Sequence, residues 1–331
     1  MPSKHLILAG DIGGTKTNLA LFSVEANKLQ SVQQGTFPSK EYPGLIPVIR
    51  EFIDPAKYRI DAASFGIAGP VVEGVVKTPN LAWTVERDAL QAALTLKAVE
   101  LINDLEATAY GIFTLEGTEF ETLNEGTVFH SGTKALIAAG TGLGESILYY
   151  DGAHFRPLAS EGGHADFAPR NELEIELLRY LIGRYEHVSY ERVLSGPGLV
   201  NIYRFLKETK RCEEPQWLAE RFDTGEDPGA VVTRTALARE AEISVTAMEL
   251  FVSIYGAEAG NLALRAKSVR GLYIGGGIAP KILPKLKDAT FMRAFTSKGR
   301  YTELLAAIPV HVILNDKTAL LGAAYHAAFI Q

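Results

Sequence analysis

The chain has 331 residues, 47% of them apolar, and its 33 Lys and Arg against 39 Asp and Glu give a formal net charge of −6. This composition excludes a disordered or fibrous chain, and at roughly 100–200 residues per domain the length predicts about two domains. The acidic balance argues against a nucleic-acid partner, because a surface that follows phosphate backbones needs clustered basic residues.

The single cysteine and the short apolar runs indicate the cellular compartment in which the protein resides. Cys212 is the only cysteine, so no disulfide forms within the chain and no cysteine cluster holds zinc or iron–sulfur. A membrane span needs roughly 20 mostly apolar residues in a row, and the runs at residues 136–139 and 318–330 are too short or are broken by His326. The run at residues 6–9 is also too short for a secretory signal peptide. We therefore expect a cytoplasmic protein that does not enter membranes.

Two strand pairs, each separated by a turn rich in glycine and threonine, stand in different parts of the chain. In chain order the strands and turns are residues 6–9, 10–15 and 18–24, then residues 136–139, 140–144 and 146–150. Recurrence of this arrangement about 130 residues later predicts two related halves.

Other apolar runs and periodic stretches complete the expected elements. Further strand candidates are residues 63–67, 74–77, 99–103, 271–274 and 310–314, and helical periodicity is clearest over residues 173–182 and 243–262. Strands and helices that alternate within each half predict an α/β protein in which long helices cover at least one face of each sheet.

The first turn carries a possible phosphate site. Gly13 and Gly14 allow a backbone to approach a phosphate, and successive N–H groups form an anion-binding concavity. Asp11 would repel that phosphate unless a magnesium ion, reached directly or through water, lay between them. In isolation the segment fits better a Gly-Gly hairpin with Asp11 as a turn residue, and only the recurrence of such a turn at residues 140–144 favours a phosphate site.

The second turn, at residues 140–144, follows a buried strand but is followed by another strand. Glu145 stands where the dinucleotide fingerprint requires its last glycine, and the chain contains no GxxxxGK[ST] sequence. These two facts count against a Rossmann dehydrogenase and against a P-loop kinase. A third glycine cluster, at residues 275–277, ends the strand candidate at residues 271–274.

Three segments carry candidate polar groups for a ligand. Asp104 follows a strand and begins an apparent helix, where loop ends gather in open α/β sheets, although an Asp in this position is commonly the helix N-cap. Residues 161–167 place Glu161, His164 and Asp166 around two glycines; His164 and Asp166 could be two metal ligands, but no third is evident. Glu191 precedes a Ser-Gly-Pro turn and a helix that we expect to begin at Leu199.

Taken in order, these segments resemble the ATP-dependent bacterial glucokinase family, within the sugar kinase, actin and heat-shock chaperone superfamily. Residues 11–15 resemble its first phosphate motif, residues 140–144 the second and residues 275–277 the adenosine motif. Residues 161–169 and 191–199 resemble segments typical of glucokinases rather than of the whole superfamily. The resemblance covers nearly the whole chain.

The resemblance implies a reaction and a role for each matching residue. The protein would phosphorylate the 6-hydroxyl of glucose with ATP and Mg²⁺, with Asp104 as the general base. The residues that bind the sugar would be Asn103, Asp104, Glu161, His164 and Glu191. Those that bind the nucleotide would be Asp11, Gly13, Gly14, Thr15, Lys16, Gly140, Thr141, Gly142, Gly275 and Gly276, with Asp11 holding Mg²⁺ through water. Lys16 stands where many glucokinases carry Asn.

The resemblance also implies the architecture, a two-domain actin-like ATPase fold of the ribonuclease H-like type with an interdomain cleft that closes on sugar. The small domain would comprise residues 1–113 and 313–331, and the large domain residues 114–312. Residues 315–323 resemble the segment that returns the chain to the small domain. We expect a homodimer, because the family often forms one.

Two alternatives stay open at this stage. The first is a kinase for another hexose or a broad-specificity hexokinase. The second, from another class, is a non-catalytic ATP-binding sugar sensor or an actin-like assembly module, which would keep the glycine motifs but would not need an acid at Asp104.

Overall fold

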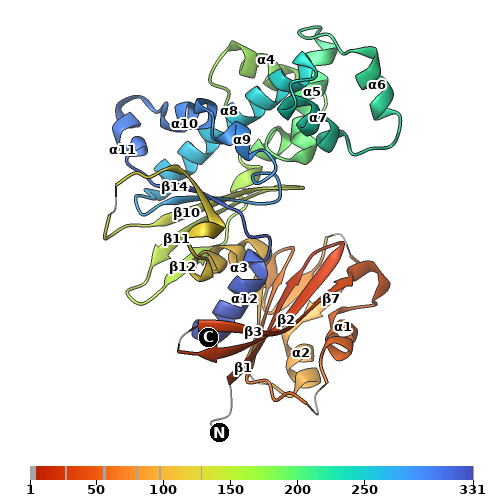
Figure 1. Ribbon diagram of the computed structural model, residues 1–331, viewed down its shortest axis with the longest axis vertical. Coiled ribbons are helices and arrows are strands. Elements are labelled where there is room, and N and C mark those ends of the chain that lie inside the picture. Colours follow the sequence, from red (N-terminus) through yellow and green to blue (C-terminus); the bar gives the residue numbers. More distant parts are fainter. Residues whose placement is uncertain are drawn as a thin grey trace. The chain divides into compact units, whose positions relative to one another are not determined.

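The computed structural model describes residues 5–26, 28–54, 57–79, 81–96, 98–127 and 129–330, which fall into two compact units (Figure 1). Unit 1 comprises Met1–Glu119, Leu148–Ala159 and Asn315–Gln331, and unit 2 comprises Phe120–Ile147 and Ser160–Leu314. The C-terminal helix therefore belongs to the unit that contains the N-terminal strands.

A five-stranded sheet in the order β3-β2-β1-β4-β8 forms the centre of unit 1. Its strands are β1 (His5–Ile12), β2 (Lys16–Glu25), β3 (Lys28–Pro38), β4 (Ala62–Ile67) and β8 (Val99–Asn103). β1, β2 and β3 pair antiparallel as a meander, whereas β1, β4 and β8 run parallel. Because parallel strands share one carboxyl edge, Asp11 near the end of β1 and Asn103 at the end of β8 lie at the same edge of the sheet.

Helices cover both faces of this sheet. Apolar side chains of α1 (Leu45–Phe52) and α2 (Arg87–Leu94) pack with Leu8, Leu19 and Phe65 on one face. α12 (Thr318–Phe329) packs with Ala9 and Phe22 on the other, and it also contacts α3 (Asp104–Gly111). A small sheet in the order β5-β6-β7 adds β5 (Val71–Val72), β6 (Val75–Lys77) and β7 (Thr84–Glu86).

A second sheet has the order β12-β11-β10-β13-β14-β9. Its strands are β9 (Phe120–Asn124), β10 (Lys134–Ala139), β11 (Leu143–Tyr150), β12 (Phe155–Leu158), β13 (Leu272–Gly275) and β14 (Val310–Ile313). β10, β13 and β14 run parallel, and β9 joins the edge antiparallel to β14. Without β9, the order matches that of the first sheet: three consecutive strands and then two parallel ones. The predicted relation between the two halves is thus confirmed in the topology.

Unit 2 holds most of the helices. They are α4 (Glu172–Ile182), α5 (Gly196–Glu208), α6 (Gln216–Phe222), α7 (Pro228–Leu237), α8 (Glu242–Ala266), α9 (Leu283–Leu286), α10 (Ala289–Thr296) and α11 (Thr302–Ala306). α8 is buried on most of its circumference, as expected of a helix that is apolar all round. It packs against α5, α7, α10 and β10, so it forms the centre of one core with the strands of the second sheet. The prediction that long helices cover a sheet face is confirmed.

Two expected boundaries differ from the structure. The helix expected to begin at Leu199 begins at Gly196, because the Ser195 side chain accepts from Gly198 N and Pro197 fits the first turn. The strand expected at residues 74–77 begins at Val75, after Gly74 adopts a positive φ of 78°. Among the residues described, no helix is long and apolar enough to cross a membrane.

Candidate active site

In unit 1, two carboxylates lie near each other at the carboxyl edge of the sheet. Asp11 pairs within β1 against Asn18, so it is a strand residue and not part of the turn. Asn18 Nδ2 donates to Asp11 Oδ2 at 3.2 Å. The pKa of Asp11 is raised to about 6, because burial and, to a smaller extent, the charge of Asp104 raise it by more than the bond from Asn18 lowers it. The two carboxylates are therefore close enough to repel each other.

This environment fits a bound Mg²⁺. A partly buried acid near a second acid is stabilised by a divalent cation, and Mg²⁺ prefers oxygen ligands. In the described part of the chain, no group of three or more His, Cys, Asp or Glu is placed to hold a metal ion by itself. Mg²⁺ commonly binds through one or two carboxylates together with water and substrate phosphates, and Asp11 suits that mode.

The turn after β1 is held in shape by a residue that the sequence analysis missed. Gly13 N donates to Lys16 O at 2.9 Å. Ser39, in the short 3-10 helix η1 (Ser39–Glu41), donates from Oγ to Gly13 O at 2.8 Å and from its backbone nitrogen to Thr15 O at 3.0 Å. Ser39 is fully buried. No spacing signal identifies it, because it is distant in sequence and meets the turn only through the pairing of β2 with β3.

The helix cap at the start of α3 is Asn103, not Asp104. Asn103 Oδ1 accepts from Leu105 N at 2.9 Å, and the Glu106 side chain accepts from Asn103 N to complete a capping box. Asn103 Nδ2 donates to Gly69 O at 3.0 Å. Asp104 is the first helical residue, and its Oδ1 accepts from Leu105 N. The interpretation of Asp104 as the N-cap is therefore wrong.

In unit 2, two glycine motifs lie at the carboxyl ends of neighbouring parallel strands. Ala138 of β10 pairs with Gly275 of β13, and Ile278 N donates to Ala139 O at 3.2 Å. Gly276 has a φ of 82°, and a Cβ there would lie 2.2 Å from Ala139 O, so only glycine fits. A Cβ on Gly140 or Gly277 would meet no atom within 4 Å. The space beside these two glycines is therefore open.

The two segments expected to bind sugar come together in unit 2. The 3-10 helices η4 (Gly162–His164) and η5 (Tyr190–Arg192) are joined by Tyr190 N, which donates to Ala165 O at 2.9 Å. His164 Nε2 and Glu191 Oε2 are 4.0 Å apart. Glu191 Oε2 also accepts from Leu143 N at 3.0 Å. Glu191 thus lies beside both His164 and the turn 140–142, while Glu161 is exposed at the N-cap of η4.

The possible metal pair of His164 and Asp166 is not formed. Asp166 Oδ1 pairs instead with His187 Nε2 at 2.9 Å on the surface. A bridge between Asp166 and Ser189 fixes the two chain segments side by side, so Asp166 serves the structure of this region.

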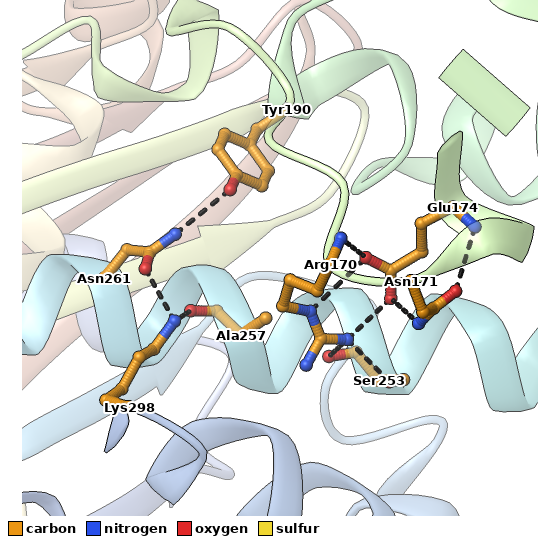
Figure 2. A network of polar contacts seen from close by, with 8 residues as sticks. All are labelled: Arg170, Asn171, Glu174, Tyr190, Ser253, Ala257, Asn261 and Lys298. Carbon is orange, nitrogen blue, oxygen red and sulfur yellow. Dashed lines mark hydrogen bonds and ion pairs between the residues drawn. The ribbon is translucent and has the colours of Figure 1, made fainter. Parts of the chain in front are cut away.

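Residues of α8 bond to Tyr190 of η5 and to Arg170, which precedes α4 (Figure 2). Asn261 Nδ2 donates to Tyr190 OH at 3.0 Å, and Lys298 Nζ donates to Asn261 Oδ1 at 2.6 Å. At the other end, Arg170 pairs with the buried Glu174 at 2.7 Å and donates to Ser253 Oγ at 2.8 Å. The sequence analysis missed this network, because its members become neighbours only in the folded chain.

Comparison with known proteins gives one consistent result. The family model described as glucokinase matches residues 8–329. A glucokinase of Nostoc sp. is 44% identical over 98% of this chain and 99% of its own length, and one of Synechocystis sp. is 40% identical over 97% of both. The crystal structure of a glucokinase from an Antarctic psychrotroph superposes with a TM-score of 0.86 at 29% identity, over 97% of this chain and 98% of that one.

These similarities confirm the predicted fold class, an α/β actin-like ATPase fold, and the predicted resemblance. The family uses ATP, in keeping with the glycine motifs at β1, β10 and β13. The match extends over both units and over every segment that carries a candidate residue, so the chain belongs to the glucokinase family.

Proposed function

We propose that this protein is an ATP-dependent glucokinase, which transfers the γ-phosphoryl group of ATP to the 6-hydroxyl of glucose and gives glucose 6-phosphate and ADP. The observation that carries the proposal is the position of Glu191. Its carboxylate lies 4.0 Å from His164 and accepts from Leu143, the residue that follows the glycine turn at 140–142. One carboxylate thus links the segment typical of glucokinases to a phosphate motif.

Asp104 is the general base in this proposal. It would take the proton of the 6-hydroxyl as that oxygen bonds to phosphorus and the bond to the β,γ-bridging oxygen breaks. A carboxylate base typically contributes about 10²–10⁴-fold to such a step. The nearness of Asp104 to Asp11 places it by the acid proposed to hold the metal, and its position at the start of α3 fixes it to a rigid element.

Hydrogen bonds to the remaining hydroxyls would select the sugar. The residues proposed for this role are Asn103, Glu161, His164 and Glu191. Each presents a polar side chain that can pair with a hydroxyl, and His164 and Glu191 already lie together. A site built of such pairs can reject an analogue that lacks one hydroxyl by up to roughly 10⁴-fold, because buried polar groups would be left unpaired.

The nucleotide would be held by backbone at the glycine motifs. The proposed contacts are Gly13, Gly14, Thr15 and Lys16 in unit 1 and Gly140, Thr141, Gly142, Gly275 and Gly276 in unit 2. Asp11 would hold Mg²⁺ through water, and the bound ion would neutralise charge on the phosphates. Lys16 and Thr15 have exposed side chains, so both side chains, including the positive charge of Lys16, are accessible to a nucleotide in this proposal.

Three further expectations remain part of the proposal. The domain boundaries are residues 1–113 with 313–331 for the small domain, and residues 114–312 for the large domain. A cytoplasmic location suits a chain with a single cysteine. A homodimer follows only from the family resemblance.

The experiment that tests the function measures ADP release by the purified protein with ATP and Mg²⁺. It is run without sugar and then with glucose, mannose, fructose, galactose and N-acetylglucosamine, and the sugar phosphate is identified. Stimulation chiefly by glucose supports the proposal. A different preferred sugar keeps the kinase and corrects the substrate, whereas saturable sugar binding without ADP release makes the protein a sensor.

A further inference from the structure

Glu145 lies directly beneath one of the proposed sugar-binding segments. It is the third residue of β11 and only 2% exposed. A Cβ built on Gly162 would lie 2.5 Å from Glu145 Oε2 and 3.2 Å from Glu145 Cβ. A Cβ on Gly163 would lie 2.0 Å from Leu143 O. The helix η4 therefore rests on the first three residues of β11, and the carboxyl group of Glu145 forms part of that support.

A second buried acid shares a cation with Glu145. Arg265 Nη2 donates to Glu145 Oε2 at 3.2 Å and also to Glu258 Oε1. Glu258 is completely buried, while the Arg265 side chain is about half exposed. Two carboxyl groups thus contact the same atom, Arg265 Nη2. The single positive charge of Arg265 can balance only one ionised carboxylate.

Glu258 continues the network to the other proposed sugar-binding segment. Asn261 Nδ2 donates to Glu258 Oε2 at 2.8 Å and to Tyr190 OH at 3.0 Å. Figure 2 shows the second of these bonds, together with the bonds from Lys298 to Asn261 and Ala257. Tyr190 is the first residue of η5 and directly precedes Glu191. The same set of polar groups therefore contacts η4 through Glu145 and η5 through Tyr190.

The two acids are not equivalent. Glu258 receives bonds on both oxygens, from Arg265 and from Asn261. Glu145 Oε1 has no hydrogen-bond partner among the residues described, and a buried ionised carboxylate in that state is costly. Burial and the neighbouring Glu258 raise the pKa of Glu145 well above its usual range, although Arg265 lowers it. Burial, the unpartnered oxygen and the neighbouring Glu258 therefore all favour the neutral form of Glu145.

We propose that Glu145, together with Glu258 and Arg265, is a positioning residue that holds the turn Gly162–His164 in the shape that binds glucose. The inference rests on the proposed function, since it takes Glu161 and His164 to contact the sugar. Glu145 itself does not touch substrate. Its role depends on the length of its side chain and on the positions of its hydrogen-bonding atoms, not on a negative charge.

The first test compares Glu145→Ala with Glu145→Gln. Glu145→Ala removes the support beneath Gly162, so we expect the KM for glucose to rise about 10- to 100-fold, the scale on which small misplacements of binding groups act, with little change in the KM for ATP. Glu145→Gln preserves length, shape and neutrality, so it should restore the KM for glucose to near the parent value. Glu242→Gln, at an exposed position of α8, is the matched control and should change neither constant.

The second test uses pH. The charged and titratable groups that face Glu145 are Glu258, Arg265 and Tyr255, all of α8. Tyr190 of η5 and Lys298 face Glu258. As Glu145 loses its proton on the alkaline side, a negative charge forms in a buried position beside Glu258, so the KM for glucose of the parent should rise there. Glu145→Gln cannot ionise, so its KM should stay level across the same range. This comparison needs only the isosteric variant and applies even where Glu145→Ala does not fold.

Glu161→Ala distinguishes a failure of the proposed sugar site from a failure of the inference about Glu145. If Glu161→Ala leaves the KM for glucose unchanged, the proposed sugar site is wrong. If Glu161→Ala raises that KM while Glu145→Ala does not, the inference about Glu145 is overturned and the proposed function stands. An alkaline rise of the same size in Glu145→Gln and in the parent would also overturn it.

Discussion

Leu143 N donates to Glu191 Oε2 at 3.0 Å, and this bond ties the strand after the turn 140–142 to a carboxylate proposed to bind glucose. Gly142 also lies close to this carboxylate, because a Cβ on Gly142 would lie 2.6 Å from Glu191 Oε2. A change at Glu191 therefore acts on the sugar contact and on the backbone of the phosphate turn together.

Glu191→Ala should raise the KM for glucose and the KM for ATP. The variant removes a charged acceptor, whose hydrogen bonds are worth about 1.5–3 kcal/mol, so a loss of roughly 10- to 100-fold is expected for glucose. Glu191→Gln keeps an oxygen that can accept from Leu143 N, so the KM for ATP should stay near the parent value. Steady-state kinetics with each substrate varied in turn measures both constants.

The exposed Glu186 provides a control for charge alone. Glu186→Ala should leave both constants unchanged. Equal effects of Glu191→Ala and Glu191→Gln on the KM for ATP would show that the bond to Leu143 does not support the phosphate turn.

Asp104→Asn should lower kcat by roughly 10²–10⁴-fold, because it removes the proposed general base while its amide oxygen can still accept from Leu105 N. Glucose affinity should change little, and calorimetric titration of glucose into the variant checks this. The fold of α3 should persist, since its cap is Asn103. A loss of kcat below tenfold would remove Asp104 from the role of base.

Asp11→Asn should raise the Mg²⁺ concentration needed for half-maximal rate by about 10- to 100-fold, the range found when groups that contact a metal through an intermediate partner are changed. The physical reason is that replacement of the partly buried carboxylate of Asp11 by an amide removes the charge that favours a cation. The measurement is the rate at saturating glucose and ATP as Mg²⁺ is varied. Asp88→Asn, on the exposed side of α2, is the control; an equal shift in both variants would contradict the assignment.

The sequence predicted those strands that are short continuous apolar runs bounded by glycine or polar residues. The expected strand at residues 99–103 coincides with β8, and the expected helix at residues 173–182 begins one residue late. β3 went unpredicted because its residues alternate in exposure along a largely polar edge strand, which has no apolar run. Gln and Ser occupy both faces of β3, so its sequence does not alternate between apolar and polar residues.

The site was predictable where it lies at strand ends and not where it depends on distant partners. Asp104 and the glycine turns stand directly after apolar runs, so strand geometry places them. Asn103 and Asp104 are adjacent residues that both make good caps, and only the extended backbone of Asn103 decides between them. Glu145 is recognised as a support only in the folded chain, where it meets Gly162 and also Arg265, which is 120 residues further along the chain.

His326 makes unit 1 sensitive to acid. Its Nδ1 lies 3.2 Å from Ser64 Oγ, and its ring lies 5.1 Å from that of Tyr110. Burial, with the nearby charge of Arg156, lowers the pKa of His326 to about 4, from the ordinary value of 6.5. Below pH 6.5 the unfolded chain binds a proton that the folded chain does not, so stability is full above that pH and falls as pH drops towards 4.

Replacement by a residue that does not titrate should remove this dependence. The free energy of unfolding of the parent should fall by up to about 1.4 kcal/mol per pH unit between pH 6.5 and 4 through this group, and His326→Gln should show a shallower slope. Urea unfolding at several pH values measures both. His130→Gln, at an exposed position, should keep the slope of the parent, and an unchanged slope in His326→Gln would assign the acid sensitivity to other groups.

α3, which begins with Asp104, packs against α12 with almost no space at one point. A Cβ on Gly322 would lie 1.8 Å from Ala107 O and 2.4 Å from Gly111 N. Backbone atoms of α3 would have to move to admit even one methyl group.

Gly322→Ala should therefore lower the free energy of unfolding by about 1–3 kcal/mol, the usual cost of overpacking, and the gain in helix propensity is too small to offset it. Because α3 must shift and Asp104 with it, kcat should fall as well in the molecules that remain folded. Gly117→Ala adds a Cβ that meets no atom within 4 Å, so it should leave stability and kcat close to those of the parent. Full stability with full kcat in Gly322→Ala would mean that α3 and α12 separate without moving Asp104, and that the base is positioned by β8 and the Asn103 cap alone.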